Sequence, residues 1–490
     1  MKILVVGGGT AGWLTSLFLN KTFPEHKIEL IESEQVGILG AGESTTIPFF
    51  ELLRYLDINE NEFLKKTKST FKSLVRFNDW NIQQSSFVSP MYPSCLPLSP
   101  EYFGGNTSEY FIYCAVNNIK INERGYPKLS SNNKSPFALV NGEKVNVGGY
   151  TYQINAKLTA QYFRTIAEKR GVIRHEGKIV KVNGHHPITS VEDDKGIIHS
   201  FDFVIDCSGF ARLLIGKHYQ EKWNDYTKHL TVDSAIPFFL EMDEEIPPYT
   251  SATAMTNGWM FKVPTQERYG SGYVFDSSKI DAEQAKKEVE KKLGYEVNLV
   301  NNFKFKAGVF EKSWISNCLS FGLASGFLEP MSATNIGIMI FLFEYLKTIK
   351  GFKYSEYNIV EFNRLSKEYS ENFSCLIYLH YMNNQMDNSF WNHYRQLENA
   401  PTKLQKSLED FFFNNKFDIL DFAHSINQNP NKIITVLTGN KMFEENYKKY
   451  YQIANLENRY GEIDKRIMET TNFLMDKCID HREYLEKYCN

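Results

Sequence analysis

Hydrophobic and polar positions near the N-terminus follow first a strand pattern, then a helix pattern, then a strand pattern again. Residues 2–6 are a short β-branched run, residues 13–21 carry apolar side chains at helical spacing, and residues 27–32 form a second strand-like run. The glycine-rich residues 7–12 separate the first strand from the helix. This order predicts a βαβ unit, which opens a doubly wound parallel sheet.

The pattern changes further along the chain. Short aromatic pieces broken by Pro, Ser, Asn and Gly predict a loop-rich insertion, β alternation over residues 230–275 predicts a second sheet, and the chain beyond about residue 337 is largely helical. We therefore predict an α/β fold with a doubly wound domain, an inserted β region for substrate and a helical C-terminal lobe. The predicted segments are 1–82, 151–215 and 305–350 for the doubly wound domain, 83–150 and 216–304 for the insertion, and 351–490 for the helical lobe.

Composition narrows the function classes. A net charge of -3 gives no electrostatic reason to expect a nucleic acid partner, and no run of 18 uncharged apolar residues predicts a membrane span. Seven cysteines lack any C-x-x-C pair, and no basic, apolar leader precedes the first strand, so we expect free thiols in the cytoplasm. The His, Cys and Asp positions show no metal-ligand spacing, and no metal is expected.

The glycine turn carries the first candidate site. In a G-x-G-x-x-G turn the first glycine permits a tight bend, the second lets the backbone approach a pyrophosphate, and the third lets the helix pack closely on the strand. A carboxylate at the end of the second strand can accept hydrogen bonds from a ribose. We predict dinucleotide binding by Gly7, Gly9, Thr10, Ala11 and Gly12, with Glu32 on the ribose.

Two later segments favour FAD over NAD as this dinucleotide. Residues 204–209 (VIDCSG) resemble the strand and small-residue turn of flavoprotein monooxygenases, and residues 319–326 (LSFGLASG) resemble their second nucleotide-contacting strand. Each segment alone is also compatible with a buried strand that ends in a small-residue turn. We predict that Asp206 and Gly322 contact the cofactor, and that the doubly wound domain is of the GR2 type.

Several segments, in order along the chain, resemble the flavin-dependent tryptophan halogenase family. The likeness extends from the N-terminus to about residue 391, and chance does not supply matches in this order. The matching segments are 7–13 (GGGTAGW), 42–48 (GESTTIP), 70–77 (TFKSLVRF), 258–264 (GWMFKVP), 270–275 (GSGYVF), 327–334 (FLEPMSAT), 380–381 (HY) and 387–391 (DNSFW).

The resemblance implies a division of labour among these segments. Reduced FAD and oxygen convert a halide to hypohalous acid, and this oxidant moves to Lys72, which holds it by hydrogen bonding or accepts the halogen as a haloamine. The bulk of Trp259 keeps the substrate away from the flavin. Strap residues Gly42, Glu43, Ser44 and Thr45 cover the flavin, and Thr334 and Asn335 bind the halide through backbone N–H groups. The residues alone favour a solvated strand position for Lys72 and ordinary core packing for Trp259; the flanking segments favour the functional roles.

The departures from the family pattern affect the expected substrate. Phe261 replaces the second tryptophan of the signature, Ser332 replaces an acidic residue, Asn335 replaces a glycine, and residues 420–450 show no recognisable tryptophan clamp. Because serine is no base at neutral pH, we expect an electron-rich indole, phenol or pyrrole and an easily oxidised halide such as bromide or iodide. Aromatic residues between 91 and 113, namely Tyr92, Tyr102, Phe103, Tyr110, Phe111 and Tyr113, either line the substrate pocket or form a hydrophobic seam.

The resemblance also implies partners. No second nucleotide fingerprint is visible for NADPH, so a separate flavin reductase is expected to supply reduced FAD; homo-oligomerisation is left open. Two alternatives stay open. One is a flavin-dependent aromatic hydroxylase, which inserts oxygen without halide. The other is a non-catalytic flavin-binding homologue, which the changes at Ser332 and Phe261 permit.

Overall fold

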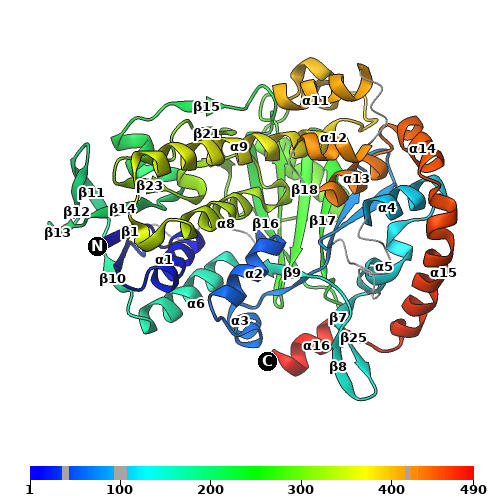
Figure 1. The fold of residues 1–490 in the computed structure, drawn as a ribbon, viewed down its shortest axis with the longest axis horizontal. Coiled ribbons are helices and arrows are strands. Elements are labelled where there is room, and N and C mark those ends of the chain that lie inside the picture. Colours follow the sequence, from blue (N-terminus) through cyan, green and yellow to red (C-terminus); the bar gives the residue numbers. More distant parts are fainter. Residues whose placement is uncertain (36–42, 93–106, 414–418, 427–428, 490) are drawn as a thin grey trace.

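A six-stranded sheet forms the first part of the fold. The computed structural model describes the chain except for residues 36–42, 93–106, 414–418, 427–428 and 490 (Figure 1). The strand order is β10-β2-β1-β14-β23-β22, parallel throughout except for the last strand, and this confirms the predicted α/β class. The strands are β1 (Lys2–Val6), β2 (Lys27–Glu32), β10 (Ile173–Glu176), β14 (Phe203–Asp206), β22 (Trp314–Ile315) and β23 (Cys318–Ser320).

Helices cover this sheet because its central strands are apolar on both faces. Val5 and Ile205 are fully buried neighbours in the sheet. Helix α1 (Thr10–Thr22) packs between α6 (Ala156–Lys169) and α8 (Thr334–Lys347), and Phe18 stacks on Phe343 of α8 with ring centroids 4.2 Å apart. Helix α8 is thereby fixed against α1.

A seven-stranded sheet lies in the middle of the molecule (Figure 1). Its order is β20-β16-β19-β18-β17-β5-β6, and the only parallel pair is β17 with β5 among the described strands. Because β5 and β6 belong to it, this sheet starts before the domain boundary that the sequence places at residue 82. Its strands are β5 (Leu74–Asn78), β6 (Ser86–Pro90), β16 (Ser234–Glu241), β17 (Tyr249–Met255), β18 (Gly258–Pro264), β19 (Arg268–Phe275) and β20 (Phe303–Lys304).

A small sheet connects the two large ones. Strand β9 (Thr151–Ile154) pairs with β3 (Glu43–Ser44) on one side and with β4 (Thr70–Lys72) on the other. All four residues of β9 are buried. This sheet therefore holds the strap-like segment and Lys72 on either side of one strand.

The region from residue 83 to 150 is more regular than the predicted loop-rich insertion. It contains helix α4 (Thr107–Val116), which is buried on almost every side and so shows no amphipathic period in the sequence, and helix α5 (Gly125–Ser131). Strand β7 (Lys134–Val140) pairs with both β8 (Glu143–Asn146) and the C-terminal strand β25 (Cys478–Asp480).

The C-terminal lobe is helical, as predicted, and lies along one side of the central sheet (Figure 1). None of the described helices combines the length and the apolar character that crossing a bilayer requires. The lobe comprises α9 (Glu356–Tyr381), α10 (Ser389–Arg395), α11 (Thr402–Phe413), α12 (Ile419–Ser425), α13 (Pro430–Gly439), α14 (Glu444–Ile453), α15 (Leu456–Met475) and α16 (His481–Tyr488). The remaining elements are α2 (Ile47–Tyr55), α3 (Glu60–Thr67), α7 (Ala282–Leu293), β11 (Ile179–Gly184), β12 (Ile188–Asp193), β13 (Ile198–Ser200), β15 (Trp223–Asp225), β21 (Gly308–Phe310) and β24 (Gly326–Phe327).

Candidate functional site

The glycine turn has three glycines with three different surroundings. Gly7 has φ +113°, and a Cβ there would lie 2.3 Å from the carbonyl oxygen of Cys207. A Cβ on Gly12 would lie 1.8 Å from the carbonyl oxygen of Gly7. At Gly9, by contrast, a Cβ would meet no described atom within 4 Å. The first two glycines are required by the protein itself, whereas the space beside Gly9 is open to a ligand.

The start of helix α1 is suited to an anion. Its N-cap is Gly9, and no side chain in the described chain caps the helix. The first N–H groups of a helix need acceptors, and the helix dipole favours negative charge at this end. The turn that carries Gly322 (φ +65°) approaches the same helix, because a Cβ on Gly322 would lie 3.0 Å from the Cβ of Ala11. The predicted residues of the two segments are thus adjacent, and the geometry fits the pyrophosphate of FAD.

Glu32 ends β2 directly beside the glycine turn. A Cβ on Gly8 would lie 1.4 Å from Oε2 of Glu32, so the carboxylate occupies the space that the glycine leaves. Arg174 donates from Nε to Oε1 of Glu32 at 2.7 Å, and Arg164 lies 3.5 Å from the same oxygen. These two cations hold the carboxylate in position and leave Oε2 toward the turn, which suits the predicted ribose contact.

The carboxylate of Asp206 accepts several hydrogen bonds from the protein itself. Its Oδ1 accepts hydrogen bonds from the backbone N–H and the hydroxyl of Ser208, at 3.0 and 2.6 Å. Its Oδ2 accepts from the backbone N–H groups of Leu214 and Ile215, at 2.7 and 3.2 Å. With four donors from the protein, the fully buried carboxylate holds the turn after β14 in place. The cofactor contact of Asp206 stays a prediction.

The strap-like segment is fixed by hydrogen bonds to β9 and β17. The Thr45 hydroxyl donates to the carbonyl oxygen of Tyr152 at 2.7 Å, and the hydroxyls of Ser44 and Thr250 lie 3.2 Å apart. Burial raises the pKa of Glu43 to about 7, so its carboxyl is easily protonated. Gly42, which the sequence also assigns to the strap, lies outside the described residues.

Lys72 is buried, with 1% of its surface exposed. Its Nζ donates a hydrogen bond of 3.0 Å to the backbone carbonyl of Thr45 in the strap. Burial, and then the charge of Lys432, lower the pKa of Lys72 to about 7. The solvated alternative that the strand pattern left open is thereby excluded. A large fraction of this amine is neutral near pH 7.

Lys432 on α13 is a basic group that sequence reasoning missed. It is partly exposed along its length, yet burial of its ammonium group lowers its pKa to about 8. Its charge acts on both Lys72 and His380. A lysine before the apolar run of residues 433–437 gives no sequence signal by itself, because helix ends on protein surfaces often carry one.

His380, by contrast, is a buried structural residue, as its place in the helical lobe suggests. Its Nδ1 lies 2.7 Å from the carbonyl oxygen of Leu376, so Nδ1 carries the proton. Its ring contacts Phe77 at 5.1 Å between centroids, and burial lowers its pKa to about 3. The imidazole is therefore neutral, with Nε2 as an acceptor.

Trp259 lies in β18 within the aromatic core of the central sheet. It is 4% exposed, and its ring centroid lies 6.5 Å from that of Trp80 and 5.9 Å from that of Phe261. Phe261, which replaces a tryptophan of the family signature, lies over Gly272, where a Cβ would be 2.7 Å from its ring. Core packing and a blocking role are compatible here, because a rigid wall of aromatic rings can do both.

The halide-side turn precedes helix α8. Ser332 and Ala333 have φ values of 63° and 52°, and the helix begins at Thr334 without a side-chain cap in the described chain. Asn335 lies within the helix, and the left-handed backbone of the turn falls on Ser332 and Ala333. The turn lies against β3 of the strap. The uncapped N–H groups of α8 suit a halide ion.

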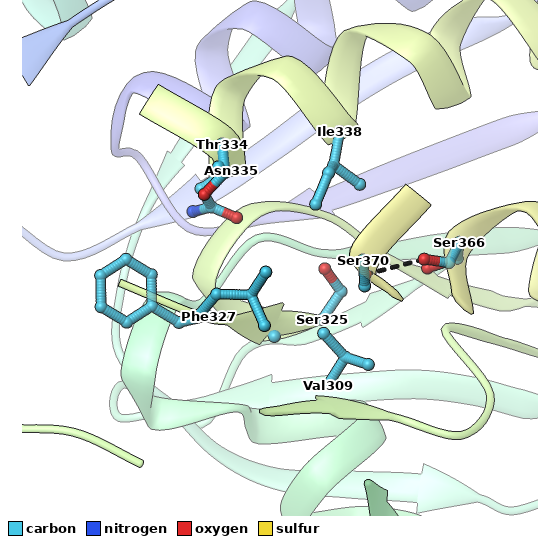
Figure 2. Close-up of a pocket in the computed structure, with 10 residues that line it drawn as sticks. Val309, Ser325, Phe327, Thr334, Asn335, Ile338, Ser366 and Ser370 are labelled. Carbon is cyan, nitrogen blue, oxygen red and sulfur yellow. Dashed lines mark hydrogen bonds between the residues drawn. The ribbon is translucent and has the colours of Figure 1, made fainter. Parts of the chain in front are cut away.

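A small pocket opens beside this turn (Figure 2). Thr334 and Asn335 from α8 lie above it and Phe327 to the left, with Ser325 and Val309 below and Ser370 to the right (Figure 2). The pocket combines the polar start of a helix with apolar walls. The uncapped helix start favours an anion at this place.

Glu329 is a second titratable group that sequence reasoning named only as part of a motif. It is 1% exposed and accepts hydrogen bonds from the Tyr381 hydroxyl at 2.8 and 3.1 Å. Burial raises its pKa to about 8. At neutral pH the carboxyl is therefore mainly protonated, three positions before Ser332.

The structure describes only part of the aromatic stretch between residues 91 and 113. Tyr102 and Phe103 lie outside the described residues. Tyr110 belongs to α4, and its hydroxyl donates to Asp464 of α15 at 2.7 Å. This places Tyr110 in the packing between α4 and the C-terminal lobe. Within the described residues no group of His, Cys, Asp and Glu is arranged to hold a metal ion.

Comparison with known protein sequences identifies the family to which the chain is similar. The family model described as tryptophan halogenase matches residues 2–455. The chain is 29% identical to the tryptophan 7-halogenase RebH of Lentzea aerocolonigenes, over 93% of this chain and 88% of that protein. It is 30% identical to the tryptophan 7-halogenase KtzQ of Kutzneria sp. (strain 744), over 68% of this chain and 67% of that protein.

Solved structures show the same fold. Tar14, a tryptophan C-6 flavin-dependent halogenase from taromycin biosynthesis, aligns with a TM-score of 0.87 at 24% identity and covers 100% of both chains. Xcc4156, a flavin-dependent halogenase from Xanthomonas campestris, aligns with a TM-score of 0.80 at 25% identity and covers 100% of this chain and 98% of its own.

Proposed function

Because the chain belongs to the tryptophan halogenase family, whose members are flavin-dependent enzymes, we propose that it halogenates an electron-rich aromatic small molecule through Lys72. When bound, reduced FAD together with oxygen supplies the oxidising power that turns a halide ion into hypohalous acid. A separate flavin reductase provides the reduced cofactor. The substrate is an indole, phenol or pyrrole, and the halide is bromide or iodide.

The observation that carries this proposal is the setting of Lys72. A lysine with 1% exposure and no acidic partner among the described residues is unusual, because a buried ammonium without a carboxylate is costly. Its lowered pKa makes the neutral amine available. A neutral amine can accept the halogen of hypohalous acid and release water, and the haloamine then passes the halogen to the ring.

The strap links the proposed halide turn to Lys72. The β3 strand lies against the turn of residues 331–333, and the next residue, Thr45, accepts the hydrogen bond of Lys72. Changes at the cofactor that move the strap would therefore reach the amine directly. Thr45 thus acts as a positioning residue, because its carbonyl orients Nζ without touching the reacting atoms.

Ser332 restricts the kind of aromatic ring that the site can halogenate. After the ring has accepted the halogen, a proton must leave the ring carbon, and a serine hydroxyl is too weak a base to remove it at neutral pH. Electron-rich rings lose this proton readily, for example to water. The substrate class and the easily oxidised halide both follow from this weak base.

The test is a halogenation assay with purified protein, FAD, a flavin reductase, NADH and chloride, bromide or iodide in turn. Mass spectrometry follows phenol, indole and pyrrole substrates. We expect halogenated product with the wild type, a fall of more than about 100-fold in Lys72→Met, and unchanged NADH-dependent flavin oxidation in that variant. The matched control is Lys262→Met, since Lys262 lies in β18 but pairs with Asp243 at 3.3 Å.

Two outcomes would contradict the proposal. Hydroxylated product without halide would favour the aromatic hydroxylase, in which oxygen itself is inserted. Flavin oxidation without any modified aromatic product, the same in wild type and Lys72→Met, would favour the non-catalytic flavin-binding homologue.

A further inference from the structure

Strand β9 lies between the strap strand β3 and the strand β4, which ends in Lys72. In the register of this sheet Gln153 is opposite Ser44 on one side and opposite Thr70 on the other. Because side chains alternate along a strand, Gln153 shares one face of the sheet with Lys72 and with its pairing partner Thr151. Apart from Ser44, each of these side chains is at most 1% exposed, so this face is polar and yet withdrawn from water.

The side-chain amide of Gln153 holds the backbone immediately before Lys72. Its Nε2 donates to the carbonyl oxygen of Phe71 at 2.8 Å and to the hydroxyl oxygen of Thr70 at 3.1 Å. Thr70 can accept this bond because its own hydroxyl donates to the carbonyl oxygen of Pro264 at 2.7 Å. The two shortest contacts of Nε2 therefore use both N–H groups of the amide on β4.

The oxygen of the same amide is connected to the strap. The Thr250 hydroxyl donates to Oε1 of Gln153 at 3.0 Å, and the hydroxyls of Thr250 and Ser44 lie 3.2 Å apart. Because the proton of Thr250 is used on Gln153, Ser44 donates in the second of these bonds. A directed chain of hydrogen bonds therefore runs from the strap through the Gln153 amide to the peptide before Lys72.

This chain adds to the direct bond between Lys72 and the strap. The amine donates to the carbonyl oxygen of Thr45, whereas the Gln153 amide holds the backbone from which the lysine side chain starts. A lysine side chain is long and flexible, so its amine is placed accurately only if both ends are held. The strap fixes one end directly and the other end through Gln153.

We propose that Gln153 is a positioning residue for halogenation: it holds the strand of Lys72 against the strap, so that the place of the strap determines where the amine points. The inference rests on the proposed function, because it concerns the same lysine. Gln153 acts through the Phe71 peptide and Thr250 and takes no part in the chemistry itself. A glutamine suits this task because it offers two donors and an acceptor and carries no charge that would disturb the amine.

The first experiment measures the amine itself, without turnover. FAD-loaded and FAD-free protein are acetylated with limiting acetic anhydride between pH 6 and 10, and mass spectrometry compares Lys72 with the exposed Lys448. Gln153→Met removes the hydrogen bonds of the amide, and Gln153→His keeps one donor and one acceptor.

The matched control is Gln266→Met. Gln266 also donates from Nε2 to two backbone carbonyl oxygens, those of Leu64 at 2.9 Å and Ser69 at 2.7 Å. Neither of these acceptors belongs to the strap or to β4. The control therefore loses the same kind of bond close to β4 without cutting the connection to the strap.

In the wild type we expect FAD to change the acetylation rate of Lys72 at least about fivefold, the lower end of usual coupling between sites. Gln153→Met reduces this change to less than about twofold. It also raises the pKa of Lys72, read from the pH dependence of acetylation, by about one unit, because a loosened strand admits water to the amine. Gln153→His and Gln266→Met behave as the wild type does.

Three results overturn the proposal. The first is a wild-type Lys72 that does not respond to FAD, and the second is a Gln153→Met variant with the wild-type response and pKa. The third is an equal change in Gln266→Met, because the loss of any such amide would then suffice. If Gln153→Met does not fold, Thr250→Val replaces it, since this variant keeps the bonds from Gln153 to β4 and cuts the link to Ser44. It should abolish the FAD response by itself.

The second experiment separates this inference from the proposed function. Halogenated product per flavin oxidised should fall about 10- to 100-fold in Gln153→Met, while the rate of flavin oxidation stays unchanged. Acetylation needs neither halide nor oxygen, so it decides the role of Gln153 even if no halogenated product is found. Conversely, product that depends on Lys72 but not on Gln153 leaves the proposed function intact and removes only the positioning role.

Discussion

The glycine turn and the surroundings of Lys72 are built by opposite means. In the glycine turn, neighbouring backbone atoms restrict each position. A Cβ added to Gly7 or Gly12 would lie 2.3 Å or less from a carbonyl oxygen. Around Lys72, four segments far apart in the chain meet, and a charged group is left without a charged partner from the described residues. In the first region the protein's own backbone fixes the shape and leaves the N–H groups at the start of α1 for a ligand, whereas in the second region the group left without a partner is a buried side chain.

This difference distinguishes the parts of the molecule that maintain its shape from the parts that bind and react. A region whose groups are all satisfied keeps a shape, as the Glu32 carboxylate with its two arginines does. A region with unsatisfied groups stores free energy that a ligand can release, and buried amines without carboxylates are such groups. Changes in the first region should therefore act on folding or cofactor binding, and changes in the second on reactivity and substrate choice.

The largest effect is expected from the glycines that the protein itself requires. Gly7→Ala places a Cβ 2.3 Å from a carbonyl oxygen at φ +113°, and it should lower the free energy of unfolding by about 3 kcal/mol. Gly9→Ala, whose Cβ meets no described atom, should change it by less than about 0.5 kcal/mol and yet weaken FAD binding about tenfold or more. Urea unfolding and flavin fluorescence titration measure the two quantities.

The pair of glycines can also break the comparison. Equal loss of stability in both variants would mean that the open space at Gly9 is used by the protein. Unchanged FAD affinity in Gly9→Ala would place the pyrophosphate elsewhere.

The sequence predicted the first region well because its signals are local. Gly7, Gly9, Gly12 and Glu32 lie within one βαβ unit, and the required backbone geometry follows from their spacing. Asp206 shows the limit of this reasoning: a carboxylate after a buried strand looks like a ligand contact, but its four donors come from residues 208–215, whose fold the sequence pattern did not indicate.

The second region was predicted only as far as its motif reached. Lys72 was identified through its flanking residues. Its hydrogen bond to Thr45 joins residues 27 positions apart, and the charge of Lys432, which lowers its pKa, comes from a residue 360 positions away. No local pattern contains such contacts, because they arise when β3 and β4 pair with β9 and when α13 packs on β6. Likewise the sequence did not indicate the left-handed backbone at Ser332 and Ala333, which depends on where α8 begins.

The next largest effect is expected at Asp206, where stability and FAD affinity should respond differently. In Asp206→Asn one oxygen becomes an amide nitrogen that faces donors, which leaves two buried backbone N–H groups without an acceptor. We expect a loss of about 2 kcal/mol in the free energy of unfolding, with FAD affinity changed less than about threefold. Denaturant unfolding and flavin titration test this. A selective loss of FAD affinity with full stability would restore the cofactor role to this carboxylate.

A smaller effect is expected at Ser332, where the second region can be given back an acid. In Ser332→Glu a carboxylate is placed at the turn that lies against the strap, and it can take up the ring proton. We expect the ratio of rates on methoxybenzene and phenol to rise about tenfold, because the less activated ring gains more from a base. Ser332→Gln is the control of similar size and backbone demand. An equal change in both variants would show that side-chain volume, and not the base, is responsible.

The smallest effect is a shift in pH dependence, and it tests whether the two amines form one electrostatic unit. With a pKa of about 7, Lys72 loses its proton as the pH rises through this value, so halogenation per flavin oxidised should increase from pH 6 to 8 and then level off. Lys432→Met removes a positive charge that disfavours the protonated form of Lys72. The pKa of Lys72, and with it the midpoint of the pH–activity profile, should therefore rise by up to about one unit. The carboxyl of Glu43 titrates in the same range, and Glu43→Gln separates its contribution.

A rate that falls with rising pH would mean that the ammonium, through a hydrogen bond to hypohalous acid, is the active form. An unmoved midpoint in Lys432→Met would mean that the second region, like the first, consists of independently satisfied groups.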